Sequence, residues 1–385
     1  MDFNLSDEQR MLQENARRFM EKDYAFNRRQ AIATSGGFEP QVWREFAKMG
    51  WLAAGIPEAF GGVGFGAVET AILAEEMGRG LLLEPYLHGC LLPAAVLQHC
   101  ADEAQQAELL PAIGAGEVMM AVACSEPESR GDVAWVATTA QRRGDGYVLN
   151  GHKSVVVCAA QSDRVLVVAR TAGEPSSPEG LSLFLLHRNA PGLSLTTVRL
   201  LDGTPAADLL LDDVIVPADA LLGMEGHAYV GLQRAIDELI VHQCAEIVGG
   251  MEDVLALCAD YLKTRKQFGV PIGSFQALQH RMADMAIETM QARASLHRGL
   301  AILAGDTPAH ERSAQISGCK AQVMRSAKFV TAQGIQLHGG YGLTEEFRVG
   351  HHYRRLVLSN AWWGGLEYHL SRYARLIQGI GATAF

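Results

Sequence analysis

The chain has 385 residues, of which 48% are hydrophobic, enough to bury a large core in two or three structural lobes. Its formal net charge of −10 gives no electrostatic support for a nucleic-acid partner, and no basic run suggests binding to a membrane surface. The seven cysteines lack Cys-x-x-Cys spacing, which indicates reduced thiols, and no stretch of about 18 apolar residues predicts a membrane span. We therefore expect a cytoplasmic protein.

The first part of the chain is predicted to be entirely helical. Ser6–Gln9 forms a capping box, and helical patterns continue through 67–78 and 91–113. A run of glycines at 62, 64 and 66 has the wrong spacing for a dinucleotide fingerprint and follows no strand, so it indicates a surface loop. We place an N-terminal helical domain at residues 1–117.

Near Glu117 the pattern changes to short apolar runs of strand length. Turn pairs such as Asp145-Gly146 and Asn150-Gly151 are predicted to separate these runs. Many short strands at this spacing indicate an antiparallel barrel or small sandwich at residues 118–225. The expected strands are 118–123, 133–140, 147–149, 154–158, 164–169, 181–187, 193–198 and 207–211.

From Gly226 onward the pattern is helical again, and we place a C-terminal helical bundle at residues 226–385. Apolar residues recur at three- and four-residue steps, which predicts a long helix with one buried face. These are Ile236, Ile240, Cys244, Ile247, Met251, Val254, Cys258 and Tyr261. Gly269 and Pro271 end this helix, and the same period restarts at Phe275. Two long helices joined tightly are antiparallel neighbours in a bundle.

The corner between these helices carries a recognisable string, from Arg-Lys-Gln-Phe-Gly at 265–269 to Met-Ala-Asp-Met at 282–285. Alone, Arg265 would be explained as a helix C-terminal cation. The whole string resembles the helix-corner signature of the acyl-CoA dehydrogenase family, flavoproteins that oxidise CoA thioesters. The resemblance implies FAD as cofactor, with Arg265 on its pyrophosphate and Phe268 and Gln276 beside it.

The family's architecture, which the resemblance implies here, is an α+β fold. It combines an N-terminal all-helical domain, a middle antiparallel β-barrel or sandwich and a C-terminal four-helix bundle. The segment Gln333–Glu346 resembles a second family motif, which implies FAD-binding roles for Gln336, Leu337, His338, Gly339 and Gly340. Paired glycines let the backbone approach a ligand, which suits the adenylate half of a dinucleotide.

Three histidines, at 338, 351 and 352, raise the possibility of a metal site. They lack His-x-x-x-His spacing and have no companion carboxylates at ligand spacing in the sequence. We therefore predict no metal site.

The motifs on the flavin-ring side are uneven. Cys124–Pro127 matches the family's Thr/Ser-Glu-Pro turn, which implies that Ser125 offers its hydroxyl and backbone N–H to the isoalloxazine. Gly131 then stands where the family has a Ser. In the next strand Val155 and Val157 replace the family's Trp and Thr, and a valine has no hydroxyl to donate. These valines are more simply explained as strand-core residues.

The catalytic carboxylate is also displaced, because Trp363 occupies the position where most relatives carry the glutamate. Indole has no acid–base chemistry at neutral pH. Some relatives place the base on the helix before the corner, which corresponds to Leu239, with Glu238 and Glu246 nearby. Glu367 remains as a candidate because it lies one helical turn beyond Trp363.

Three hypotheses follow from these residues. The chain is a half-site subunit of a heteromeric acyl-CoA dehydrogenase that pairs with a homologous larger subunit, or a self-sufficient homotetramer with a displaced base, or a flavin-free scaffold. The resemblance is greatest to the small subunits of pimeloyl-CoA and steroid-degrading enzymes. It implies an acyl-CoA substrate and an electron-transferring flavoprotein as acceptor. Retention of Arg265, Gln276 and Gln336 disfavours a scaffold, and loss of the ring-side residues disfavours self-sufficiency.

Overall fold

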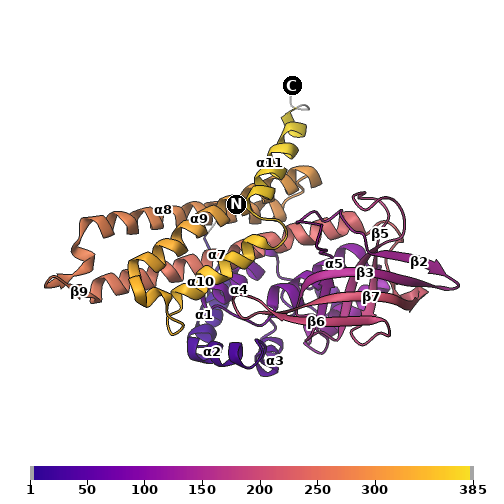
Figure 1. Cartoon of the computed structure of the whole chain (residues 1–385), viewed down its shortest axis with the longest axis horizontal. Helices are drawn as coiled ribbons and strands as arrows, with labels where there is room; N and C mark the ends of the chain where they lie inside the picture. Colours follow the sequence, from indigo (N-terminus) through magenta and orange to yellow (C-terminus); the bar gives the residue numbers. More distant parts are fainter. Residues whose placement is uncertain (1–3, 382–385) are drawn as a thin grey trace. The chain divides into compact units, whose positions relative to one another are not determined.

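The computed structural model describes residues 4–381 and confirms the α+β class, with helices followed by a sheet and then by helices (Figure 1). The chain divides into two compact units. We call one the helical unit, made of the chain up to Gln30, Ala67–Leu82 and the chain from Ile240 onward. The other is the mixed unit, made of Ala31–Gly66 and Leu83–Leu239. None of the helices within 4–381 combines the length and hydropathy that crossing a bilayer requires.

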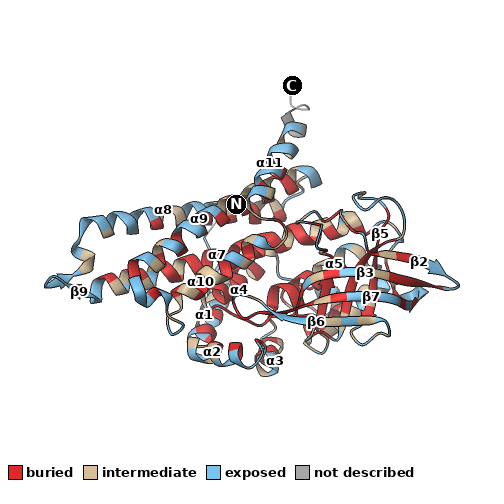
Figure 2. Cartoon of the chain, viewed as in Figure 1, coloured by how far each residue is buried: buried red, intermediate tan, exposed pale blue. Residues whose placement is uncertain are grey.

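The helical unit is built around long helices, and the predicted helix–corner–helix is confirmed. Along the described chain its helices are α1 (Asp7–Arg18), η1 (Phe19–Asp23), the start of α2 (Phe26–Thr34), α4 (Ala67–Arg79), most of α7 (Ala228–Thr264), η5 (Ile272–Ser274), α8 (Gln276–Ala304), α9 (Ala309–His338), η6 (Gly339–Leu343), α10 (Val349–Ala361) and α11 (Leu366–Gly381). Helix α9 packs along α8, α10 and α11. The predicted apolar stripe of α7 is buried from Ile236 to Cys258, as the red positions in Figure 2 show.

Helices α4 and α7 approach each other at backbone distance. A Cβ added at Gly78 would overlap the carbonyl of Glu246, and one added at Gly249 would overlap the carbonyl of Glu75. Each helix therefore places a glycine against the backbone of the other, and no larger residue fits at either position. A Cβ at Gly334 of α9 would likewise meet Val254 of α7 at 2.5 Å.

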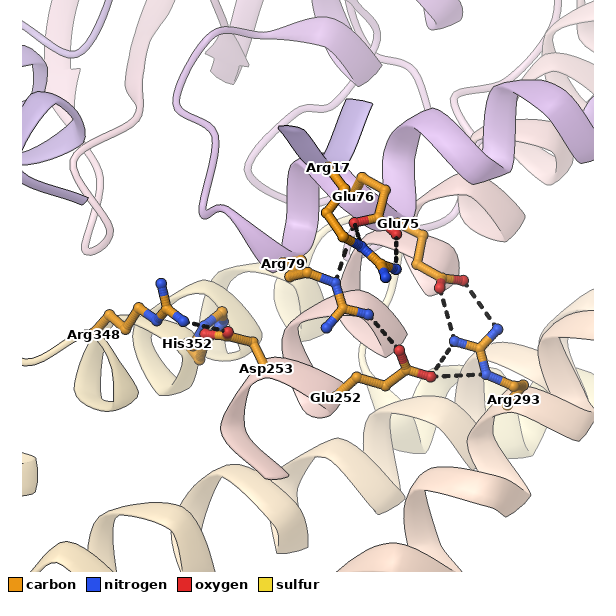
Figure 3. Close-up of polar contacts among 9 residues, drawn as sticks. All are labelled: Arg17, Glu75, Glu76, Arg79, Glu252, Asp253, Arg293, Arg348 and His352. Carbon is orange, nitrogen blue, oxygen red and sulfur yellow. Dashed lines mark hydrogen bonds and ion pairs between the residues drawn. The ribbon is translucent and has the colours of Figure 1, made fainter. Parts of the chain in front are cut away.

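Beside this crossing, the helical unit contains a chain of ion pairs (Figure 3). Its members are Arg17, Glu76, Arg79, Glu252, Arg293 and Glu75. The fully buried Glu76 carboxylate accepts hydrogen bonds from Arg17 at 2.6 Å and from Arg79 at 3.2 Å. Glu252 lies between Arg79 and Arg293. Buried charges are tolerated when each is paired in this way, so the network fixes how α1, α4, α7 and α8 pack together.

The mixed unit has an eight-stranded sheet with its own helices. The helices are α3 (Pro40–Lys48), η2 (Glu58–Phe60), η3 (Tyr86–Leu91), α5 (Leu92–Cys100), α6 (Glu103–Gly114) and η4 (Ala218–Ala220). The strands are β1 (Met120–Ala123), β2 (Thr139–Arg143), β3 (Gly146–Val157), β4 (Arg164–Arg170), β5 (Leu181–His187), β6 (Leu193–Arg199), β7 (Pro205–Pro217) and β8 (Leu221–Leu222). Their order is β6-β7-β3-β2-β4-β5-β8, and β1 pairs with β4 in parallel.

Two strand predictions are wrong in an informative way. Asn150-Gly151 does not form a turn but lies within β3, at a register shift against β7. The glycine is needed there because a Cβ would overlap the side chain of Thr138. The predicted strand 133–140 is irregular up to Thr138, because the carbonyls of Ala134 and Val136 accept hydrogen bonds at 2.9 Å from the guanidinium of Arg170.

A buried ion pair joins β3 to the turn that follows β1. The Lys153 ammonium lies 2.6 Å from Oε1 of Glu126, and both side chains are almost completely buried. Glu126 also accepts the backbone N–H groups of Ala137 at 2.9 Å and Thr138 at 3.1 Å. Burial raises the pKa of the Glu126 carboxyl, but the Lys153 ammonium and these N–H groups outweigh burial and lower it overall.

We predict that Lys153→Met lowers the free energy of unfolding by about 3–5 kcal/mol, because it leaves the Glu126 carboxylate buried without its cation. Denaturant titration at pH 7 measures this loss. The exposed pair of Arg142 and Glu225 supplies the control, since Arg142→Ala should leave the free energy of unfolding nearly unchanged. Because the pKa of Glu126 is lowered in the folded state, its contribution is present above its unfolded pKa and is lost as the pH falls through the folded value. A Lys153→Met protein as stable as the parent would contradict this account.

Candidate functional site

The corner between α7 and α8 is a small hairpin that presents an aromatic ring to solvent. The backbone N–H of Arg265 donates to the Tyr261 carbonyl at 2.8 Å, and β9 (Lys266–Gln267) then pairs with β10 (Val270–Pro271). Phe268 and Gly269 form the two-residue turn, with φ values of 54° and 81°. Positive φ at both central residues is the type I′ geometry, which is uncommon for phenylalanine. The result is a Phe268 side chain that is 92% exposed.

Arg265 extends from this corner without an anionic partner among the described residues. The residue is exposed and its guanidinium forms no hydrogen bond or ion pair there, whereas the side chains of Arg17, Arg79 and Arg293 in the same unit are all paired with carboxylates. Gln276, the first residue of α8, is also exposed. An exposed guanidinium, a planar amide and an open ring on one corner are groups that can bind a diphosphate.

The end of α9 presents backbone rather than side chains. Gln336 is exposed in the last turn, and a Cβ at Gly339 or Gly340 would meet nothing within 4 Å. Leu337 and His338 are buried, and Nδ1 of His338 bonds the Gly334 carbonyl at 2.8 Å. The two glycines therefore leave open space into which a ligand can bring its own groups.

Both motifs lie at the same end of the helical unit. The rings of Tyr261, one turn before Arg265, and His338 are 4.5 Å apart. Across the neighbouring helices, Arg281 of α8 donates to Gln333 of α9 at 2.6 Å. The structure thus brings together the corner residues and the glycine segment that the sequence placed some 70 positions apart. Their exposed cation, amides and open glycines fit the pyrophosphate and adenylate half of FAD.

In the mixed unit, the ring-side segments also lie together. The backbone N–H of Ser154 donates to the Ser125 carbonyl at 2.9 Å, next to the Lys153–Glu126 pair. Val155 has a φ of 51° and is 44% exposed, which is a strained conformation for a β-branched residue. Val157 is buried. The surface beside Ser125 therefore presents a valine where the family packs an aromatic ring.

The loop between α10 and α11 carries Trp363, with a φ of 58°, and Gly364, with a φ of 94°. Glu367 lies in the first turn of α11 and is exposed, so solvent rather than a dry pocket surrounds its carboxylate. Glu238 bonds His99 at 3.0 Å and Arg234 at 2.6 Å. Glu246 pairs with Arg355 and is a buried contact between helices.

The histidines have separate structural partners. Nδ1 of His351 lies 3.1 Å from the Arg29 guanidinium. Figure 3 includes His352, whose Nε2 lies 2.9 Å from the Asp253 carboxylate. Among the residues that the structure describes, no group of three or more histidine, cysteine or acidic side chains could hold a metal ion.

Two buried groups escaped the sequence reasoning. The Lys153–Glu126 pair joins two ring-side motifs that lie apart in the sequence, and its signal was a lysine just before the apolar run at 155–157. Lys320 is fully buried in α9, in a stretch of small and apolar residues from Ser317 to Met324 that contains no acidic residue to pair with it. A lone lysine in such a stretch is the signal that could have found it.

Comparison with known families covers nearly the whole chain. Models of the acyl-CoA dehydrogenase N-terminal, middle and C-terminal domains match residues 6–117, 121–214 and 232–378. Acryloyl-CoA reductase (NADH) of Anaerotignum propionicum is 31% identical over 383 residues, which cover 97% of this chain and 95% of that protein.

Solved structures share the fold along the chain. The Tcur3481-Tcur3483 steroid ACAD superposes with a TM-score of 0.87 at 30% identity, covering 98% of this chain and 99% of that one. PigA, solved with FAD and proline, has a TM-score of 0.90 at 26% identity and the same coverage of both chains. With the identity to the reductase and the three domain matches, these results show that the chain belongs to the acyl-CoA dehydrogenase family.

Proposed function

We propose that this chain is a subunit of an FAD-dependent acyl-CoA dehydrogenase, in which it binds the adenylate and pyrophosphate half of FAD for a homologous larger subunit. The reaction of the assembly is α,β-dehydrogenation of a CoA thioester, with an electron-transferring flavoprotein as acceptor by family resemblance. The resemblance extends to relatives in which one FAD spans two subunits. A chain that binds only the adenylate and pyrophosphate arm of FAD needs the residues that contact this arm. It does not need the residues that contact the flavin ring.

One contrast carries this proposal. The arm-side residues are present and available, since Arg265 has no anionic partner among the described residues and Phe268 is 92% exposed. The ring-side and catalytic positions have lost their chemistry, because Val155, Val157 and Trp363 supply neither a hydroxyl nor a carboxylate. The steroid ACAD relative, whose name joins two proteins, is consistent with a heteromeric enzyme.

When bound, FAD supplies the hydride acceptor, while a carboxylate takes the α-proton of the thioester. The residues of this chain would bind and orient the cofactor. The Arg265 guanidinium would neutralise the pyrophosphate, Gln276 and Gln336 would donate hydrogen bonds, and the Phe268 ring would exclude water from the diphosphate. Gly339 and Gly340 would let the backbone approach the adenylate half.

A second candidate is a self-sufficient homotetramer whose base is Glu367. It is supported by the position of Glu367, which lies four residues beyond Trp363 at the start of α11, and by the reductase relative that matches almost the whole chain.

The two candidates predict different flavin content. Purified alone, the chain should carry little flavin and no acyl-CoA dehydrogenase activity, because it lacks the ring-side groups. Co-expressed with its larger subunit, it should form a yellow, active α2β2 assembly with two FAD rather than four. Absorbance at 450 nm against protein concentration, with native mass spectrometry, measures both. One FAD per chain in a homo-oligomer would contradict the half-site proposal.

Arg265→Ala should release most of the flavin from the assembled protein, because the pyrophosphate loses its fixed cation. The free energy of unfolding of the chain alone should change by less than about 0.5 kcal/mol, since the side chain is exposed. Lys263→Ala, which removes an exposed cation from the last turn of α7, is the matched control and should retain flavin. Lower stability with full flavin content would assign Arg265 a structural role instead.

Glu367→Gln separates the second candidate from the first. If Glu367 takes the α-proton, turnover should fall by about 10²–10⁴-fold with flavin content unchanged. The exposed Glu14→Gln on α1 serves as the control for loss of one negative charge. Turnover equal to that of the parent protein would exclude Glu367 as the base.

A further inference from the structure

Lys320 is a buried cation without a buried anion. Its side chain is fully inside the helical unit, and no carboxylate forms an ion pair with it among the described residues. Its ammonium donates instead to two neutral oxygens, Oε1 of Gln243 on α7 at 3.1 Å and the carbonyl of Trp362. A buried ammonium normally has a charged partner, so this arrangement requires a reason of its own.

His369 binds the next carbonyl along the same loop. It is fully buried in α11, and its Nε2 lies 2.9 Å from the carbonyl oxygen of Trp363. Burial, followed by the nearby charges of Lys320 and Arg372, lowers the pKa of His369 to about 2. The ring is therefore neutral at physiological pH, and Nε2–H donates to the carbonyl. Two successive peptide carbonyls are thus held from within, one by a lysine and one by a histidine.

The loop that they hold is strained. Trp363 adopts a left-handed φ of 58°, which is a genuine outlier for a bulky residue. Gly364 follows with a φ of 94°, and a Cβ there would overlap the ring of Tyr368. A conformation of this kind is unfavourable and persists only where the surroundings fix it. The bonds from Lys320 and His369 hold the first two carbonyls of the loop, and the N–H of Leu366 at its end donates to the side chain of Asn360 at 3.1 Å.

The titratable groups around Lys320 come from several helices. The Cys244 thiol faces it from α7, and Cys319 beside it on α9 interacts with the same thiol. From α11 come His369 and Arg372, and Arg298 of α8 lies near Cys319. None of these groups is a carboxylate. Burial, opposed only by Cys244, lowers the pKa of Lys320 to about 7.

We propose that Lys320 is a positioning residue whose proton holds the Trp362–Gly365 loop in its strained conformation. In the charged form, the bond to the Trp362 carbonyl is charge-assisted, which makes it about twice as strong as a neutral one. Loss of the proton leaves an amine with two N–H donors, so the bond weakens and the loop opens more often. The inference does not depend on which subunit carries the catalytic machinery, and so it goes beyond the proposed function.

The proposal predicts two effects of pH with opposite signs. Lys320 keeps its proton to a higher pH in the unfolded chain than in the folded one, so global stability rises as the pH increases from about 7 towards the ordinary lysine pKa. Over the same interval the loop loses its charge-assisted anchor. The protein therefore becomes harder to unfold while the loop becomes easier to open.

Hydrogen–deuterium exchange of the full-length chain between pH 6 and pH 9 tests this. After correction for the intrinsic rate at each pH, amides 362–366 should lose about tenfold protection across a one-proton transition, the factor expected when a charged hydrogen bond becomes neutral. Thermal unfolding over the same range should show the global midpoint rising. In Lys320→Met the loop should be poorly protected at every pH, and both transitions should disappear.

The control is Lys328→Met, which removes an exposed ammonium from the same helix and should behave like the parent protein. If Lys320→Met does not fold, Gln243→Leu provides the second variant, because it removes the other oxygen bound to the ammonium and should shift the loop transition to lower pH. A loop transition that persists unchanged in Lys320→Met, or in Gln243→Leu where the first variant does not fold, would overturn the proposal. Loop protection that is independent of pH in the parent protein would also overturn it.

Discussion

The close contact between α4 and α7 is the constraint on which the helical unit depends. Gly78 and Gly249 each face a carbonyl of the opposite helix, so the two backbones touch without side chains between them. This contact brings Glu75 and Glu76 of α4 close to Glu252 of α7 (Figure 3). Three carboxylates so close together need cations beside them, and arginines from α1, α4 and α8 supply these. The ion network is thus a consequence of the backbone contact, and it fixes the helices whose far ends form the candidate site.

Packing fixes the middle of the long helix α7, so the end of this helix can present exposed groups without a loss of packing. The residues around Gly249 are packed on α4, whereas the last turn and the hairpin beyond it are exposed from Thr264 to Pro271. The Phe268 side chain is 92% exposed and so does not stabilise the isolated chain, because an aromatic ring in water contributes no free energy of burial. Such a ring on a rigid hairpin is explained by a ligand or partner that covers it.

The sequence predicted the fold class and the helix corner because both depend on local patterns, while the binding of FAD by the arm-side residues stays a prediction. Helical periodicity located α7 and α8, and the corner motif has a fixed spacing. The sequence-based prediction was wrong at Asn150-Gly151, because this glycine is required by its close contact with Thr138 in another segment. It was also wrong at Val133–Thr138, where backbone carbonyls accept hydrogen bonds from the Arg170 side chain of β4. Contacts between residues distant in sequence leave no periodic signal. For the same reason, periodicity could not reveal that Lys320 reaches the carbonyl of Trp362.

Arg265 and Lys320 are both cations without an anionic partner among residues 4–378, yet they imply opposite things. The guanidinium of Arg265 is solvated, so its charge has little effect on the stability of the folded chain and is accessible to an anionic ligand. The ammonium of Lys320 is buried in every folded molecule, so its desolvation lowers the free energy of unfolding whether or not a ligand is bound. A methionine in its place would avoid that cost, as replacement of buried charges by apolar residues often does. A methionine cannot donate to the Trp362 carbonyl, so the buried charge of Lys320 bears on the geometry of the loop, whereas the solvated charge of Arg265 is accessible to an anion from outside the chain.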